Sequence, residues 1–122
     1  ERADEDLVIV VAVETPTAIA HLDEILEVGR LDGIFVGPMD LATNMGYLGN
    51  PEHPDVKDAF AVVEKQVLPT GKALGTIARD WNHAQDLYEK GYQLVTLMAD
   101  GVSLAKLATI TLATFRESYP QG

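Results

Sequence analysis

Carboxylate side chains follow three of the four most apolar segments of this chain within a few residues. Glu14 ends the first segment in VAVETP, Asp40 follows the second in VGPMDL, and Asp100 follows the fourth in LMADGV. Two carboxylates that meet in a pocket repel each other unless a cation lies between them, and oxygen ligands suit a hard divalent ion such as Mg²⁺ or Mn²⁺. Glu14 and Asp40 are therefore candidate metal ligands.

The start of a helix is the competing interpretation of each acid. Acidic residues at or near the first turn are favoured by capping and by the helix dipole, which suits Asp40, Asp80 and Asp100. Glu14 fits this role less well, because Thr15 is already available as the cap and Glu14 ends a long apolar run. Both interpretations stay open for Asp40, and capping is favoured for Asp80 and Asp100.

The elements that would position these acids repeat along the chain. Four short segments rich in Val, Ile and Leu are typical of strands buried on both faces of a parallel sheet. They are Leu7–Val13, Gly33–Gly37, Ala73–Ala78 and Leu94–Ala99. Segments with helical period lie between and after them, with start signals at Thr15-Pro16, Pro54-Asp55, Asp80 and Ser103. This order predicts an α/β fold of four βα units with parallel strands.

In such a sheet the carboxyl ends of the strands share one edge, and that edge carries the functional site. Neighbouring strands lie about 4.8 Å apart, so Glu14 and Asp40 are expected to converge there. The backbone N–H groups of the turn at residues 37–40 would add a small site for an anion. Residues 41–53 have no clear period and are interpreted as a long loop, in which His53 is a further candidate for contact with the site.

Composition narrows the possible functions. The chain has 122 residues, no cysteine and a formal net charge of −10, which excludes disulfides and thiolate metal sites and disfavours partners such as nucleic acid or anionic membranes. No segment has the length of a membrane span, so we expect a cytoplasmic protein. Residues 1–122 form a single domain, which is either a complete open sheet or half of a (β/α)₈ barrel, since a whole barrel needs about 250 residues.

Two stretches of the chain resemble the HpcH/HpaI family of metal-dependent 2-oxo acid aldolases. They are VAVETPTAIAHLDEILEV and LDGIFVGPMDLATNMGYLGNPEHPDV, and the paired V-E-T and G-P-x-D-L motifs carry the likeness together with the G-Y-x-G-N-P-x-H-P segment. The family includes 4-hydroxy-2-oxoheptanedioate and 2-keto-3-deoxy sugar acid aldolases, and macrophomate synthase is a relative. The resemblance implies a (β/α)₈ TIM barrel of which this chain is the C-terminal half, with strands five to eight and their helices.

The resemblance also implies roles for individual residues. Glu14 and Asp40 would be the protein ligands of a divalent cation, Mg²⁺ or Mn²⁺ or Co²⁺, and Gly37 and Met39 would offer backbone N–H groups to the carboxylate of the substrate. The implied reaction is cleavage of 4-hydroxy-2-oxo acids to pyruvate and an aldehyde through a metal-stabilised enolate. Relatives are homo-oligomers, and we expect the same here.

The same resemblance sets limits on this chain. The substrate-binding Arg and catalytic His of the family lie in the first half of the barrel, so no catalytic residue is assigned and the isolated chain is expected to be almost inactive. Ala12, Met39 and residues 98–101 differ from relatives, which leaves the aldehyde open. Two alternatives also remain open. One is a non-catalytic α/β module whose acids only cap helices, and the other is a citrate-lyase β-type or oxaloacetate-decarboxylating lyase.

Overall fold

One parallel sheet organises the computed structural model, which describes residues 6–120. Its strands are β1 (Val10–Ala12), β2 (Gly33–Val36), β3 (Ala73–Ile77) and β4 (Leu94–Thr96), in the order β1-β2-β3-β4. All three neighbouring pairs are parallel, and Val10 of β1 stands beside Gly33 of β2, which stands beside Ala73 of β3. The predicted α/β fold of four parallel βα units is confirmed, and each strand is shorter than its apolar segment.

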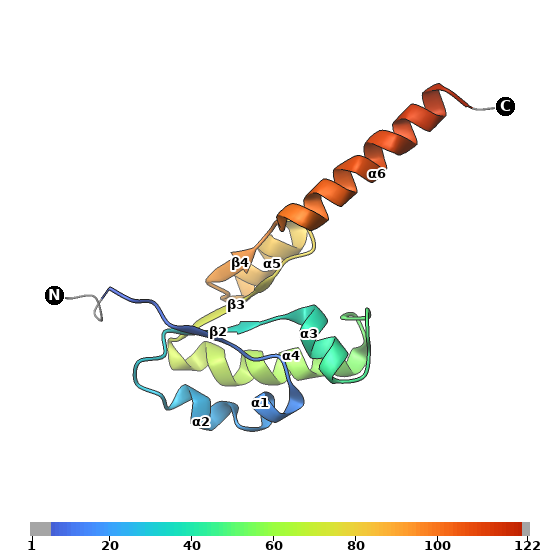
Figure 1. Ribbon diagram of the computed structural model, residues 1–122. Helices are drawn as coiled ribbons and strands as arrows, with labels where there is room; N and C mark the ends of the chain where they lie inside the picture. The colour runs from blue at the N-terminus through green and yellow to red at the C-terminus, as the bar shows by residue number, and fades with distance from the viewer. Residues whose placement is uncertain (1–5, 121–122) are drawn as a thin grey trace.

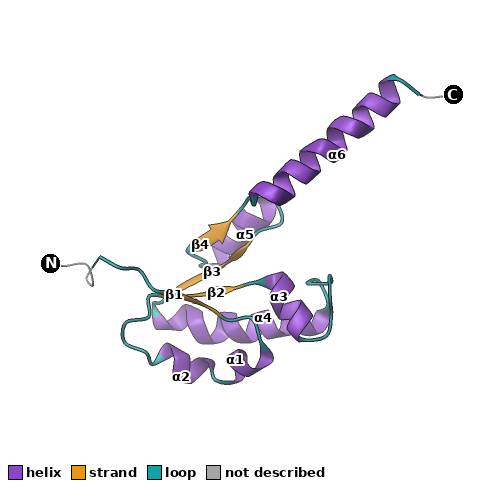
Figure 2. Cartoon of the chain, viewed as in Figure 1, coloured by secondary structure: helices purple, strands orange, loops and turns teal. Residues whose placement is uncertain are grey.

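The helices lie in the connections between the strands and after the last of them (Figure 1). They are α1 (Pro16–Ala20), α2 (Leu22–Leu26), α3 (Pro38–Asn44), α4 (Pro54–Val67), the 3₁₀ helix η1 (Leu68–Thr70), α5 (Trp81–Lys90) and α6 (Asp100–Ser118). Figure 2 shows α1, α2 and α4 together on one side of the strands, whereas α6 projects away from the rest of the chain. No helix in the described part of the chain is long and apolar enough to cross a membrane.

Most predicted helix starts are confirmed. The hydroxyl of Thr15 accepts the N–H of Ala18 at 3.0 Å, Pro54 is the first residue of α4, and Asp80 caps α5. Ser103 was the wrong residue for the last cap, because α6 already begins at Asp100 and the N–H of Ser103 donates to the carbonyl of Ala99 as part of the helix.

The prediction of a loop over residues 41–53 is wrong at its beginning. Pro38 is the first residue of α3, and its fixed φ suits that position. The helix continues through Asn44, and only the residues between Asn44 and Pro54 are irregular. Asp40 therefore lies in the first turn of a helix that continues into the segment predicted to be a loop.

Replacing Asp80 with Ala should lower the free energy of unfolding by about 1 kcal/mol. The Oδ1 of Asp80 accepts the N–H of His83 at 2.9 Å, and the variant leaves that N–H without its partner. Asp86→Ala, at an exposed position inside the same helix, is the matched control and should change stability little. Urea unfolding monitored by circular dichroism measures both, and equal effects would show that Asp80 is no more than a surface acid.

The two faces of the sheet differ in burial. Val11, Val13 and Ile34 belong to the face that packs against the helices, and the core contains Leu22, Leu41, Val56, Val63, Val67 and Leu74. The opposite face carries Val10, Ile77 and Leu94, which are 36%, 43% and 43% exposed. The prediction of strands buried on both faces is therefore wrong for this second face, because the described helices that form the core with the sheet pack on the first. None of the residues of α6 is buried either.

Candidate metal centre

Glu14 and Asp40 come from the carboxyl ends of two paired strands. Beyond β1 the pairing continues, because the N–H of Val13 donates to the carbonyl of Phe35 at 2.8 Å, and Glu14 is the next residue. Beyond β2 the chain turns at Gly37, which is the N-cap of α3, and Asp40 follows in the first turn. No side chain makes a capping hydrogen bond at this helix start, so Asp40 is not a side-chain cap.

Gly37 shows how closely the two carboxylates approach each other. A β-carbon placed on Gly37 would lie 2.5 Å from Oε1 of Glu14 and 3.3 Å from Oδ2 of Asp40. Both oxygens therefore lie within 3.3 Å of one point beside the backbone of Gly37. The structure brings these two predicted ligands together, and the missing side chain of glycine leaves the space in which they meet.

No basic side chain in the described part of the chain pairs with the two carboxylates. Within residues 6–120 no Lys, Arg or His forms an ion pair with Glu14 or Asp40. Glu14 is half-buried and Asp40 is exposed, so an ion held between them would be open to further ligands on one side. Carboxylate oxygens at about 2.0–2.1 Å suit Mg²⁺, which usually keeps several waters. The residues present therefore fit a divalent cation.

The described residues provide a pair of acids at this point and not a complete cage. Across residues 6–120 no group of three or more His, Asp or Glu side chains is arranged to hold a metal ion. A site with two protein ligands has open positions, as a Mg²⁺ site that also binds substrate requires. The arrangement is thus suited to binding a small oxygen-rich molecule together with the ion.

Asn44 joins the two strand ends and was missed by the sequence analysis. Its Nδ2 donates to the backbone carbonyl of Glu14 at 3.1 Å and to that of Asp40 at 2.9 Å. The sequence signal was its place four residues after Asp40, which puts both on one face of a helix once α3 is recognised. Asn44 therefore fixes the distance between the backbones that carry the two acids.

Asn44→Leu should weaken Mn²⁺ binding by about 10–100-fold, the usual effect of removing a residue that orients metal ligands. Leucine has a similar size and no donor, so the carbonyls of Glu14 and Asp40 lose their shared partner. Asn82→Leu, at an exposed position on α5, is the matched control and should bind Mn²⁺ like the wild type. Isothermal titration calorimetry gives both affinities, and an unchanged affinity in Asn44→Leu would show that the amide does not position the pair.

The predicted substrate-binding residues lie at the same turn. The backbone of Gly37 is buried, and the side chain of Met39 is 48% exposed beside the acid pair in sequence. The N–H groups of Met39 and Asp40 are in the first turn of α3, where the helix itself offers them no acceptor. These groups are available to an anion.

His53 and Asp100, whose roles the sequence left open, have local partners. The Nδ1 of His53 accepts the N–H of Asp55 at 3.2 Å, which caps α4, and its ring stacks on Tyr47 with centroids 3.6 Å apart. The Oδ1 of Asp100 accepts the N–H of Gly101 at 2.7 Å at the start of α6. Asp100 also follows β4, which β3 separates from β2, so it stands apart from the acid pair.

Four parallel βα units with an acid pair at the carboxyl edge of the sheet define an α/β protein. The model of the HpcH/HpaI aldolase/citrate lyase family matches residues 1–106, and this chain belongs to that family. The resemblance predicted from the sequence is thereby confirmed.

Named relatives show the extent of the similarity. The 4-hydroxy-2-oxo-heptane-1,7-dioate aldolase of Shigella flexneri is 36% identical over 118 residues, which are 97% of this chain and 44% of that protein. A crystal structure of an HpcH/HpaI aldolase/citrate lyase family protein from Burkholderia cenocepacia J2315 has a TM-score of 0.82 at 34% identity and covers 92% of this chain and 44% of that one. Macrophomate synthase shares the fold, with a TM-score of 0.81 at 23% identity over 92% of this chain and 39% of its own. This chain thus spans less than half the length of these relatives.

Proposed function

We propose that this chain forms the C-terminal part of a divalent-metal-dependent aldolase that cleaves 4-hydroxy-2-oxo acids to pyruvate and an aldehyde. The observation that carries the proposal is the meeting of Glu14 and Asp40 beside Gly37 with no basic partner in the described residues. Membership of a family whose relatives are named aldolases supports the lyase class.

Each residue of the site has a distinct task in this proposal. Glu14 and Asp40 hold the ion, and Asn44 keeps their backbones at a fixed separation. The N–H groups of the turn at Gly37 and Met39 bind the substrate carboxylate, as anions bind at helix starts. When bound, Mg²⁺ or Mn²⁺ supplies Lewis-acid stabilisation of the negative charge that develops on the 2-oxo oxygen, worth several kcal/mol.

Proton transfer is not assigned to any side chain of this chain. His53 caps α4 through its Nδ1 and stacks on Tyr47, so this nitrogen and one face of the ring already have a structural use. We therefore propose that the acid and base of the reaction belong to the rest of the intact enzyme. The isolated chain should bind the ion and the 2-oxo acid and should show little cleavage.

Binding of pyruvate in the presence and absence of Mn²⁺ tests the proposed function. Electron paramagnetic resonance of free Mn²⁺ should show one ion bound per chain, and titration calorimetry should detect pyruvate only when Mn²⁺ is present. Magnesium should compete with Mn²⁺ for the same site. A chain that binds no Mn²⁺ would contradict the proposal and favour the non-catalytic α/β module.

We also propose that copies of the chain associate. Strands β1 and β4 are the outer strands of the sheet, and open edges favour pairing with another chain. The exposed apolar side chains of the uncovered sheet face and of α6 add area that association would bury.

A further inference from the structure

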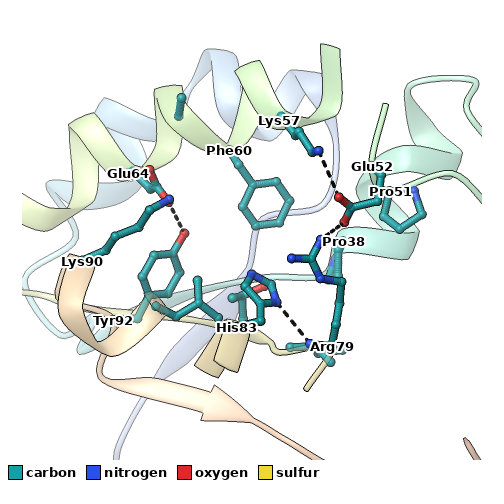
Figure 3. A pocket seen from close by; sticks show the side chains of 14 residues that line it. Pro38, Pro51, Glu52, Lys57, Phe60, Glu64, Arg79, His83, Lys90 and Tyr92 are labelled. Atoms are coloured by element: carbon teal, nitrogen blue, oxygen red, sulfur yellow. Dashed lines mark hydrogen bonds and ion pairs between the residues drawn. The ribbon is translucent and has the colours of Figure 1, made fainter. Parts of the chain in front are cut away.

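A cavity of about 320 Å³ lies among α4, β3 and α5 (Figure 3). Its lining includes apolar side chains, with Phe60 from α4 and Leu87 from α5. A volume of this size is in the range of pockets that bind small molecules, which are mostly apolar and carry a few polar groups. The cavity is therefore a candidate binding site in addition to the metal centre.

One end of the cavity is formed by two cations that share one carboxylate. Glu52 accepts from two cations, with its Oε2 at 3.0 Å from Nζ of Lys57 and its Oε1 at 2.6 Å from Nη1 of Arg79. These two hydrogen bonds hold the pKa of Glu52 below its usual range, so it is ionised at neutral pH. Among these three side chains the cations outnumber the carboxylate, whereas the carboxylates of Asp80 and Asp86 act on His83 from nearby.

His83 adds a neutral donor beside those cations. Its Nδ1 accepts the backbone N–H of Arg79 at 3.1 Å, so the neutral ring carries its proton on Nε2. Burial, assisted by the charge of Arg79, lowers the pKa of His83 below 6.5, which keeps the ring neutral at pH 7. No group in residues 6–120 accepts from Nε2, and this side of the ring faces the cavity in Figure 3.

At the opposite end of the cavity the charges balance, and the polar side chains are hydrogen-bonded to one another. Glu64 accepts the hydroxyl of Tyr92 at 2.9 Å and pairs with Lys90 at 3.1 Å. Burial and the nearby charge of Glu64 raise the pKa of Tyr92, so its hydroxyl stays protonated and keeps donating. An anionic ligand would therefore place its charge at the end formed by Lys57, Arg79 and His83.

We propose that this cavity binds a small carboxylate with a flat apolar body, such as an aromatic carboxylate. The carboxylate would accept from Arg79, Lys57 and Nε2–H of His83, and the apolar body would pack on Phe60 and Leu87. Charge-assisted hydrogen bonds to a carboxylate are the strong ones, and Arg can make two in parallel. The site is separate from the proposed function and would exist even if Glu14 and Asp40 held no ion.

The cavity is suited to binding and not to a second reaction. Its buried hydroxyls are both engaged, since Thr76 donates to the carbonyl of Val36 at 2.8 Å and Tyr92 donates to Glu64 at 2.9 Å. His83 has its Nδ1 engaged by backbone, so it has no free base to offer at that nitrogen. Pro38, the first residue of α3, also lines the cavity, so a bound molecule would lie behind the turn that carries Asp40.

Benzoate titrated into the ¹⁵N-labelled full chain tests this proposal. At pH 7.5 and low salt, benzoate should shift the amide resonances of residues that line the cavity, with a Kd of about 1 mM for so small a ligand. Benzamide has the same shape without the charge and should bind about tenfold more weakly, since hydrogen bonds to a charged group are the stronger kind. Benzylamine carries the opposite charge and should not bind there.

Variants identify the groups that recognise the ligand. Arg79→Gln and Phe60→Ala should each weaken benzoate by about tenfold or more, whereas Arg116→Gln, on exposed α6, should leave it unchanged. Circular dichroism checks that each variant is folded. Shifts confined to other parts of the chain, or equal affinity for benzoate and benzamide in the wild type, would overturn the proposal without requiring any variant.

Discussion

Glu14→Gln and Asp40→Asn should each abolish the rise in melting temperature that Mn²⁺ produces in the wild-type chain. Each substitution keeps the size of the side chain, removes one negative charge and replaces a ligand oxygen with an amide. An ion present at about 100 times its Kd stabilises a folded protein by about 2.7 kcal/mol, so loss of the response is readily seen by differential scanning calorimetry. We expect Mn²⁺ affinity to fall by more than the roughly 10–100-fold effect of losing an outer partner.

Two exposed acids provide controls for the general negative charge of the chain. Asp58→Asn on α4 and Glu27→Gln after α2 change the net charge of −10 by the same amount and lie outside the turn at Gly37. Both should respond to Mn²⁺ like the wild type. If all four variants lost the response equally, the ion would be a diffuse counterion. A full response in Glu14→Gln and Asp40→Asn would refute the metal pair.

Gly37→Ala should eliminate Mn²⁺ binding while leaving the fold nearly as stable as before. The new β-carbon would lie 2.5 Å from Oε1 of Glu14, closer than two such atoms can approach. The clash is removed at little cost, because that oxygen is the end of a flexible side chain. The carboxylate of Glu14 then moves away from Asp40. The φ of Gly37 is −84°, which any residue adopts, so alanine adds no backbone strain.

The matched control for this substitution is Gly29→Ala. A β-carbon on Gly29 meets nothing within 4 Å, so the variant should bind Mn²⁺ with unchanged affinity. Calorimetric titration with Mn²⁺ and thermal unfolding without it separate the two effects. If Gly37→Ala bound Mn²⁺ as tightly as the wild type, the space beside Gly37 would not be where the carboxylates act.

The part of the site that the sequence predicted depends on strand order. Parallel strands that are adjacent in the chain tend to pair, so residues just after them reach the same edge of the sheet. That rule places Glu14 next to the turn at Gly37 and Asp40 without any knowledge of side-chain packing. The caps at Thr15 and Asp80 were predictable for a similar reason, since their acceptors and donors are within three residues.

The remaining features depend on distances that no local pattern encodes. The link from Asn44 to Glu14 spans thirty residues of sequence and requires α3, which the sequence analysis did not recognise. The cavity depends on the separation between α4 and α5. At its charged end Glu52, which precedes α4, pairs with Arg79, which precedes α5. Burial of the second sheet face was mispredicted because apolar composition alone does not say what covers it.

Because β1 is short, an ion bound by the acid pair would also affect the stability of the sheet. Val10–Ala12 is an outer strand that pairs with β2 on one side only, so little backbone hydrogen bonding keeps it in place. An ion shared by Glu14 and Asp40 would fasten the end of that strand to α3 and close the chain between them into a ring. The ion proposed for catalysis would then also stabilise the outermost strand of the sheet. Removal of the metal would destabilise the sheet, beginning at β1.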